Sequence, residues 1–308
     1  MSILSQKHFH DEQAAYDFVE ARIWRNGTIC PHCGCTGRIG KLKGKSTRIG
    51  VYKCYDCKKP FTVKVGTIFE DSHIPLHIWL QAIYLMCGSK KGISANQLHR
   101  TLNITLKSAW FLSHRIREAM KPSGILPPLG GAGKTVEADE TYIGNKGKQS
   151  KGARGWAHKE KVLSLVERKG HVRSTHVKSV SAENLRPILK SQIDEETRLI
   201  TDDAKQYIPL GKKFAEHHSV NHSIGEYVRG DIHSNTIENY FSIFKRGMKG
   251  VYQHCSAKHL KRYLAEFDFR YNNRIAFKID DGMRAETALY GVIGKRLTYK
   301  KPSGEAKM

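Results

Sequence analysis

The spacing of hydrophobic positions divides this chain into segments of different structure. Residues 8–25 follow helical spacing with acidic residues in the first turn, and Gly27 provides a stop signal. Short β-rich pieces at 47–54 and 60–69 follow, broken by glycine, lysine and cysteine pairs. Helical spacing then returns in three pieces between residues 74 and 120. We therefore expect an N-terminal helix, a small β-rich module and a three-helix, helix-turn-helix-like unit, over residues 1–25, 26–70 and 71–122.

The second half of the chain has the pattern of a mixed sheet covered by helices. A segment rich in proline and glycine, KPSGILPPLGGAGK, ends at Lys134 and predicts a linker. Hydrophobic alternation beyond it predicts three strands, a helix and another strand, followed by further helices. The expected fold class is α/β, with a linker, a sheet domain and a basic tail over residues 123–134, 135–290 and 291–308.

The charge of the chain indicates which class of partner it binds. There are 52 Lys and Arg residues against 29 Asp and Glu, which gives a formal net charge of +23 spread along the sequence. A field of this sign attracts polyanions, and nucleic acid is the usual partner of such a globular chain. Charge alone also fits a ribosome-associated protein or a merely basic surface.

No segment has the composition of a membrane element. No stretch approaches the roughly 20 hydrophobic residues that span a bilayer, and the N-terminus lacks the hydrophobic core of a signal peptide. We expect a soluble, cytoplasmic protein without a membrane partner.

Two Cys-x-x-Cys pairs predict a zinc site in the β-rich module. Cys30 and Cys33 form one pair, Cys54 and Cys57 form the other, and 20 residues separate them. Four thiolates close a tetrahedral site with no open position, so this Zn²⁺ would be structural. Cys35 is an alternative to Cys33, although the two-residue spacing from Cys30 favours Cys33. Redox chemistry is the alternative for the whole module.

The third predicted helix of the 71–122 unit has a candidate DNA-binding face. Its inward positions by helical spacing are Leu112, Ile116 and Ala119. A second face carries Lys107, His114 and Arg117. Such a face could lie in a major groove, or it could be an ordinary surface with solvated charges.

Three acidic residues meet the sequence requirement for metal-dependent phosphoryl transfer, in which carboxylates from distant parts of a chain converge on divalent ions. Asp139 and Asp202 each follow hydrophobic strand positions, although a carboxylate at a strand end is often only a turn residue. Glu238 belongs to a predicted helix with two faces. The hydrophobic face carries Ile237, Phe241, Phe244 and Met248, and the polar face carries Asn235, Glu238, Ser242, Lys245 and Lys249. The polar face could also be a solvated surface with a helical ion pair.

These motifs together resemble a known family. The cysteine pairs, ADETYIG, LITDD, VNHS and HSNTIENYFSIFKRGMKGVYQH closely resemble insertion-sequence transposases that carry an N-terminal zinc ribbon, over about residues 25–290. The resemblance implies a catalytic domain with the RNase H-like fold of retroviral integrases. It places the family's acidic triad at Asp139, Asp202 and Glu238, the last two separated by 35 residues, and its lysine at Lys245.

The resemblance also implies the chemistry of the site. The triad would hold Mg²⁺ or Mn²⁺, while Lys245, Arg246 and Lys249 would neutralise DNA phosphates. Asn235 would lie behind the ligands or replace one. The family pattern favours Asp139 and Asp202 over their neighbours Glu140 and Asp203. His222 and His233 would lie near the metals or the DNA, or would be structural histidines.

The function expected from these features is that of an insertion-sequence transposase. It would bind double-stranded DNA at the element's ends as at least a dimer, cleave it and transfer the strand into target DNA. The resemblance implies a bacterial cytoplasm, with association to the nucleoid on DNA. The alternatives are a zinc-ribbon, helix-turn-helix regulator whose acidic residues are structural, and a host-adopted nuclease that is no longer mobile.

Overall fold

The computed structural model describes residues 2–144, 158–221 and 228–298, and the chain divides into two compact units. The N-terminal unit comprises residues 1–122 together with 275–308, and the sheet unit comprises residues 123–274. The division differs from the expected boundaries, which placed residues 275–290 with the sheet. No helix among the described residues combines the length and hydrophobicity needed to cross a membrane.

The N-terminal unit begins with α1 (Glu12–Ile23), which two short 3-10 turns precede. Asp11 caps α1 by accepting a hydrogen bond from the Ala14 amide at 2.7 Å. The Glu12 carboxylate in turn accepts from the Leu76 and His77 amides, which begin the next helix. The predicted N-terminal helix is thus present, and it starts later than the hydrophobic spacing suggested.

A small antiparallel sheet follows α1. Its strands lie in the order β1 (Ile39–Lys41), β2 (Tyr52–Cys54) and β3 (Pro60–Phe61). Its core contains Cys30, Cys54 and Phe61, with Trp24 and Tyr52 packed against them. A core this small stabilises little on its own, so a metal is expected to supplement it.

The three predicted helices of the next segment are present as α2 (Leu76–Gly88), α3 (Ala95–Leu102) and α4 (Leu106–Ala119). The C-terminal α9 (Asp281–Tyr290) packs against α2. Gly291 follows α9 so close to α4 that a Cβ atom there would lie 2.1 Å from the Ala119 carbonyl oxygen. The basic segment from 291, expected as a tail, also starts in contact with this unit, since Lys295 Nζ donates to the Ala119 carbonyl.

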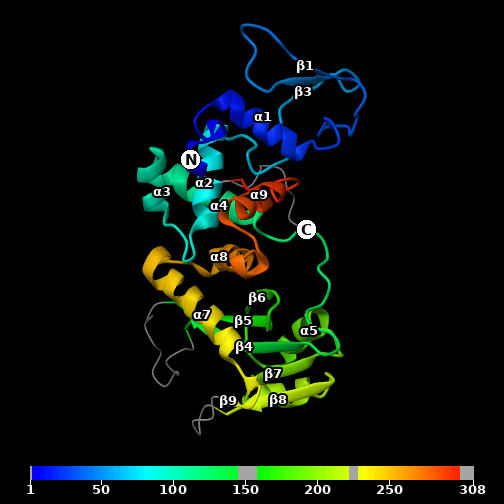
Figure 1. Ribbon diagram of the computed structural model, residues 1–308, viewed down its shortest axis with the longest axis vertical. Helices are drawn as coiled ribbons and strands as arrows, with labels where there is room; N and C mark the ends of the chain where they lie inside the picture. The colour runs from blue at the N-terminus through cyan, green and yellow to red at the C-terminus, as the bar shows by residue number, and fades with distance from the viewer. Residues whose placement is uncertain (1, 145–157, 222–227, 299–308) are drawn as a thin grey trace. The chain divides into compact units, whose positions relative to one another are not determined.

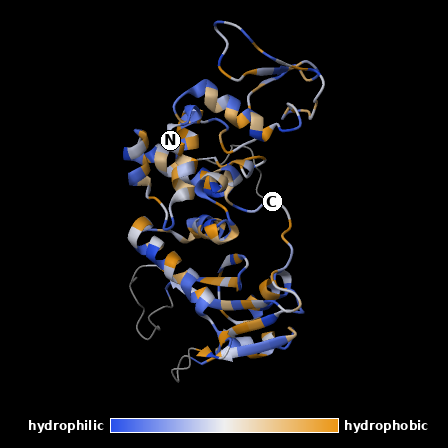
Figure 2. Cartoon of the chain, viewed as in Figure 1, coloured by the Kyte–Doolittle hydropathy of each residue, from blue (hydrophilic) through white to orange (hydrophobic). Residues whose placement is uncertain are grey.

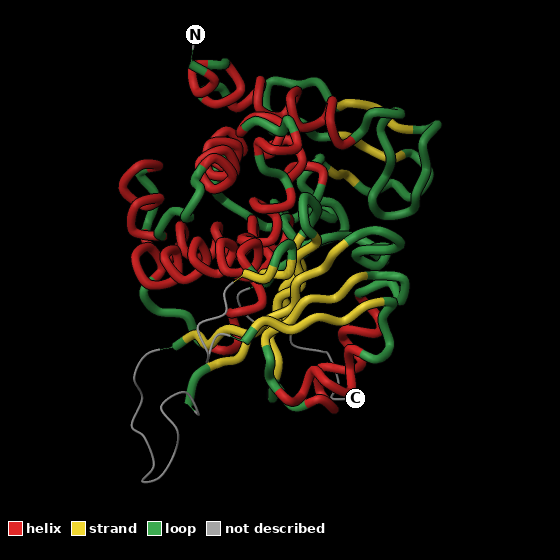
Figure 3. Tube along the Cα trace, turned by 60° about the horizontal axis from the view of Figure 1, so that its bottom comes forward, coloured by secondary structure: helices red, strands yellow, loops and turns green. Residues whose placement is uncertain are grey.

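The sheet unit contains five strands in the order β6-β5-β4-β7-β8 (Figure 1). β4 pairs antiparallel with β5, and β5 with β6, whereas β4, β7 and β8 run parallel. The strands are β4 (Thr135–Ile143), β5 (Glu160–Glu167), β6 (Val172–Val177), β7 (Arg198–Asp202) and β8 (Glu216–Val220). Figure 3 shows them side by side.

The remaining elements of the sheet unit are helices and one hairpin. The helices are α5 (Ala182–Gln192), α6 (Ile208–Gly211), α7 (Asn235–Gly247) with a π-helical turn at Met248–Tyr252, and α8 (Ala257–Asn272). The hairpin of β9 (Val228–Arg229) and β10 (Ile232–His233) leads directly into α7.

Helices cover both faces of the sheet. On one face, Val136 and Ala138 of β4 pack with Leu185 and Leu189 of α5. On the other, β4 and β5 pack against α7 and α8, whose contributions include Phe244 and Phe267. A mixed five-stranded sheet of this order with helices on both faces is an RNase H-like fold, as the sequence resemblance implied.

Helix α7 has the two faces that its sequence predicts. Ile237, Phe241, Phe244 and Met248 are at most 5% exposed and belong to the core of the sheet unit. Most of the polar face is exposed to solvent. Figure 2 accordingly colours α7 both orange and blue along its length.

A buried carboxylate connects α8 to the sheet and to α7. Asp268 accepts hydrogen bonds from the amide and hydroxyl of Ser174 on β6 and from the Tyr240 hydroxyl on α7. Burial raises the pKa of Asp268 to about 6, although these three hydrogen bonds favour the charged form.

This raised pKa predicts a pH dependence of stability. The folded protein holds the Asp268 proton more tightly than the unfolded chain does, so this contribution is complete below about pH 4 and is lost as pH rises through about 6. The free energy of unfolding of the wild type, relative to Asp268→Asn, should fall by about 2 kcal/mol between pH 4 and pH 7. Urea titrations of both proteins across this range measure the difference, and parallel curves would contradict the raised pKa.

Candidate active site and zinc centre

Two of the three predicted catalytic carboxylates meet on adjacent interior strands of the five-stranded sheet, although β4 continues to Ile143, so Asp139 does not end its strand as predicted. Asp139 lies on β4, Asp202 ends β7, and the two strands are parallel neighbours. Oxygen atoms of Asp139, Asp202 and Glu140 lie within 4.8 Å of one another. Three carboxylates at this separation offer the hard oxygen ligands that Mg²⁺ and Mn²⁺ prefer, so the donor set fits such an ion.

The electrostatics of Asp139 reflect this convergence. Burial raises the pKa of Asp139 to about 7, and the charges of Asp202 and Glu238 add to the rise. The Glu140 amide, which donates to Asp139 at 2.6 Å, and the positive charge of Lys245 oppose it. The charges of Glu238 and Lys245 on α7 thus reach Asp139 and act on its pKa in opposite directions.

Glu140 is a carboxylate that the sequence analysis set aside. Its side chain joins the cluster with Asp139 and Asp202 although the family pattern favours Asp139 as the ligand. Burial raises the pKa of Glu140 to about 8, and the charges of Asp139 and Asp202 contribute to the rise. Adjacent strand residues start on opposite faces, so sequence alternation gave no sign that both carboxylates reach one place.

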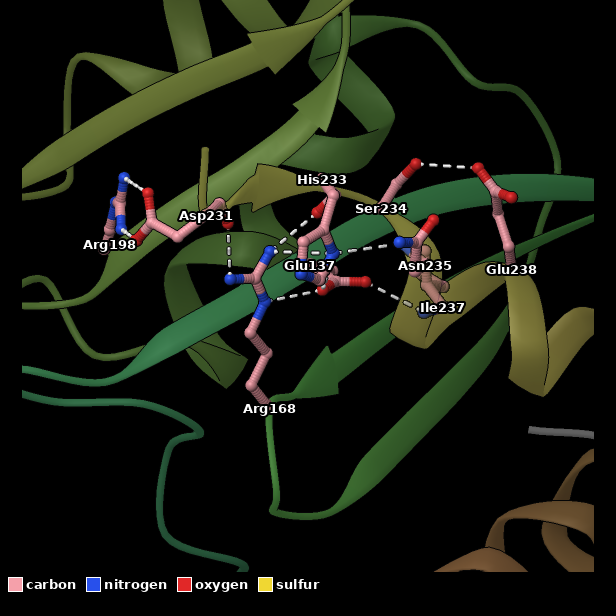
Figure 4. Close-up of polar contacts among 9 residues, drawn as sticks. All are labelled: Glu137, Arg168, Arg198, Asp231, His233, Ser234, Asn235, Ile237 and Glu238. Atoms are coloured by element: carbon pink, nitrogen blue, oxygen red, sulfur yellow. Dashed lines mark hydrogen bonds and ion pairs between the residues drawn. The ribbon is translucent and has the colours of Figure 1, made fainter. Parts of the chain in front are cut away.

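Glu238 occupies the first turn of α7 and is exposed. The Ser234 hydroxyl donates to its Oε1 at 2.8 Å (Figure 4). The three-carboxylate cluster found among the described residues does not include Glu238, so two of the three predicted triad residues are brought together there. Of the other residues predicted on this helix, Asn235, Lys245, Arg246 and Lys249 are all exposed.

A cleft of about 1020 Å³ lies beside these residues. Its lining includes Glu140 of β4 and three residues of the motif HSNTIENYFSIFKRGMKGVYQH, namely Lys245, Lys249 and His254. Lys159 also contributes. His254 ends the family-like motif but has no role predicted from it, and Lys159 carries no sequence signal beyond its charge.

The predicted DNA-binding face of α4 is only partly exposed. Leu112, Ile116 and Ala119 are buried, as helical spacing predicts. Lys107 is exposed, but His114 and Arg117 are only 1% and 2% exposed, so the three cannot form one solvent-facing surface. Spacing identifies which residues share a side of a helix, and it does not say which sides are covered.

Of the two histidines predicted near the catalytic site, His222 lies outside the described residues.

The four predicted zinc ligands converge in the N-terminal unit. The Sγ atoms of Cys30, Cys33, Cys54 and Cys57 all lie within 4.8 Å of one another. Cys30 and Cys57 are 3.7 Å apart at sulphur, and Cys33 and Cys54 are 3.6 Å apart. A tetrahedron with Zn–S bonds of about 2.3 Å has edges of about 3.8 Å, so the four thiols fit a structural Zn²⁺.

The surroundings of Cys54 favour the thiolate that zinc binds. Amide hydrogen bonds from Cys57 and Asp56 lower the pKa of the Cys54 thiol to about 7. Cys35, the alternative ligand, lies in a different group with Cys54 and Asp56.

Comparison with known protein families agrees with this geometry. Residues 128–272 match the ISXO2-like transposase domain, and residues 10–60 match a transposase zinc-ribbon domain. The chain belongs to the ISXO2-like DDE transposases of insertion sequences. The two matches fall on the sheet unit and on the segment that contains the four-cysteine cluster.

This transposase is also similar to individual proteins. It is 29% identical over 280 residues to an uncharacterized protein in transposable element ISH50 of Halobacterium salinarum, covering 86% of this chain and 92% of the relative. Among solved structures, a simian T-cell lymphotropic virus intasome in complex with PP2A regulatory subunit B56 gamma gives a TM-score of 0.29 at 16% identity, over 56% of this chain and 67% of that one. A pre-cleavage Mos1 transpososome gives 0.26 at 12% identity, over 68% and 73%.

The cysteine geometry predicts which thiols bind zinc. The purified transposase should contain about one zinc ion per chain, and Cys33→Ser should lose it because a closed site needs all four thiolates. Elemental analysis measures the zinc, and limited proteolysis of residues 26–70 should become faster as zinc is lost. Cys35→Ser is the matched control and should retain the ion. Loss of zinc from Cys35→Ser with retention in Cys33→Ser would exchange the two assignments.

Proposed function

We propose that this transposase cleaves a phosphodiester at the ends of its insertion sequence and joins the released 3′-hydroxyl to target DNA at the Asp139, Asp202 and Glu238 site. The observation that carries the proposal is the convergence of Asp139, in the middle of β4, with Asp202, at the end of β7, where the charges of Glu238 and Lys245 on α7 act on Asp139. The family assignment supports the reaction class.

In this proposal Asp139 and Asp202 hold the metal ions, and Glu238 completes the set from α7. Two divalent ions, Mg²⁺ or Mn²⁺, would supply activation of the attacking oxygen and stabilisation of the leaving oxygen. Burial raises the pKa of Asp139, and the charges of Asp202 and Glu238 raise it further, so a bound cation would stabilise the charged carboxylate. This supports a metal-binding role for Asp139. Glu140 is the alternative ligand, because its carboxylate lies in the same cluster.

Positively charged side chains beside the carboxylates would hold the DNA strand. Lys245 lies two turns after Glu238 on the same face of α7, and both are exposed. Lys249, Lys159 and His254 line the adjacent cleft. Phosphate contacts of this kind position a strand without reading its sequence.

The zinc ribbon and the α2–α4 unit would contribute to recognition of the element's ends. The exposed Lys107 on α4 is the one member of the predicted face that supports this role. Pairing of two element ends requires at least two copies of the chain, so we propose that the transposase acts as a homo-oligomer on DNA. The net charge of +23 supports binding to double-stranded DNA.

Removal of any one triad carboxylate should abolish the reaction. Asp139→Asn, Asp202→Asn and Glu238→Gln should each lower strand transfer by at least about 100-fold, because the metals supply several kcal/mol of transition-state stabilisation. Strand-transfer assays on DNA that carries the element's terminal sequence measure this loss, with gel shifts to show that DNA binding persists. Glu183→Gln, an exposed carboxylate on α5, is the matched control and should join DNA at the wild-type rate.

The same assays separate the alternatives. Glu140→Gln should retain joining, and its loss together with full activity of Glu238→Gln would move the third ligand from Glu238 to Glu140. Supercoiled DNA incubated with Mg²⁺ should be nicked by the wild type. Tight DNA binding without nicking would instead support a DNA-binding regulator, and nicking without inverted repeats around the gene would support a host-adopted nuclease.

A further inference from the structure

A second carboxylate lies on the same face of β4 as Asp139, two residues earlier. Glu137 is fully buried, and each of its oxygens has a partner (Figure 4). Oε2 accepts from the Ile237 amide in the first turn of α7 at 2.9 Å, and Oε1 accepts from Arg168 Nε at 2.7 Å. A buried carboxylate is tolerated only with such partners, and the positive end of a helix dipole is a favourable one.

Arg168, which follows β5, extends this contact to the segment that precedes α7. Its guanidinium donates to the carbonyl oxygens of Asp231 and His233, each at 2.7 Å (Figure 4). The Asp231 carboxylate is paired in turn with Arg198 at the start of β7. The hairpin that leads into α7 is therefore attached to β4, β5 and β7.

His233 completes the attachment as a hydrogen-bond acceptor. Its Nδ1 lies 3.3 Å from the Asn235 amide and 3.2 Å from Arg168 Nη2, both of which are donors. The same Nδ1 lies 3.6 Å from Glu137 Oε1, so this histidine contacts both members of the Glu137–Arg168 pair. This histidine, predicted from the sequence near the metals or the DNA, thus uses Nδ1 within the protein.

The attachment determines where Glu238 lies. Ile237, whose amide binds Glu137, is the residue immediately before Glu238, and its side chain is buried in the core. The Ser234 hydroxyl then orients the Glu238 carboxylate. Glu137 and Asp139 lie only about 7 Å apart along one strand. One strand therefore carries both Asp139 and the point at which the helix that carries Glu238 is fixed.

We propose that Glu137, together with Arg168, is a positioning residue that sets the distance between Glu238 and the two aspartates and so determines how tightly the site binds its divalent ions. This inference rests on the proposed function. Glu137 itself is not a ligand, because both of its oxygens are occupied inside the protein.

The test compares metal binding and joining in Glu137 variants of the full chain. Glu137→Ala removes both contacts, whereas Glu137→Gln retains an acceptor for the Ile237 amide. Partners behind metal ligands typically change metal affinity or activity by about 10- to 100-fold. We therefore expect Mn²⁺ binding, followed by electron paramagnetic resonance, to weaken about 10-fold or more in Glu137→Ala and less in Glu137→Gln. Strand transfer should recover partly at high Mn²⁺, and DNA binding should be unchanged.

A second buried ion pair in the sheet unit provides the matched control. Glu266 is fully buried and binds Arg270 and the Tyr252 hydroxyl on the C-terminal side of α7. Glu266→Gln and Glu266→Ala should lower the thermal stability as the Glu137 variants do, while Mn²⁺ affinity stays at the wild-type value. An equal loss of Mn²⁺ affinity in both series would overturn the proposal, because the effect would then be general destabilisation.

Failure of this inference is distinguishable from failure of the proposed function. If Glu238→Gln abolishes joining while Glu137→Gln and Glu137→Ala keep the wild-type Mn²⁺ affinity and rate, only the positioning role is wrong. If Glu238→Gln joins DNA normally, the proposed triad is wrong. Where Glu137→Ala does not fold, Glu137→Gln and Arg168→Lys decide the question, since a wild-type Mn²⁺ affinity in both would overturn the positioning role.

Discussion

The parallel pairing of β4 with β7 is the constraint on which the catalytic end of this transposase depends. Parallel neighbours cannot be joined by a tight turn, so the chain must leave the sheet and return through a crossover. Here β5, β6 and α5 lie between the two strands in sequence. The pairing brings together two aspartates far apart along the chain. It also gives β4 a partner on each side, so the strand that carries Asp139 is the central strand of the sheet.

The negative charges of the carboxylates at this site repel one another, and nearby partners in the fold partly offset the repulsion. Burial and neighbouring charge raise the pKa values of Asp139 and Glu140 to about 7 and about 8, so the metal-free site resists carrying its full negative charge. Lys245 is the nearby cation that lowers the pKa of Asp139. Glu137, on the same strand, is instead neutralised by Arg168 and a helix amide. Two acidic residues on one face of one strand thus differ in their surroundings, because Glu137 is paired with Arg168 and the Ile237 amide, whereas Asp139 lies beside two further carboxylates.

Short-range patterns in the sequence predicted the parts of this structure that depend on residues close together along the chain. The two faces of α7 follow from 3.6-residue spacing, and the zinc cluster follows from two tight Cys-x-x-Cys turns. The burial of His114 and Arg117 could not be predicted, because spacing does not show which helix faces are covered. Nor could the role of Glu137, since a charged residue in an alternating strand looks solvent-facing until Ile237, 100 residues later, is placed against it. The packing of α9 on α2 is long-range in the same way.

The two predicted metal sites also differ in how far apart along the chain their residues lie. All four thiols of the ribbon come from a short segment and need only a three-stranded sheet to converge, so zinc binding and local folding are one event there. The carboxylate cluster instead takes its residues from β4 and β7, so it exists only after the sheet unit has closed its crossover. Ligand chemistry keeps the two sites apart, because thiolates select zinc while carboxylates select hard divalent ions. In the proposed triad, α7 adds Glu238 to this cluster across a helix–sheet contact, so the precision of the proposed site depends on how firmly the helix is held at its first turn.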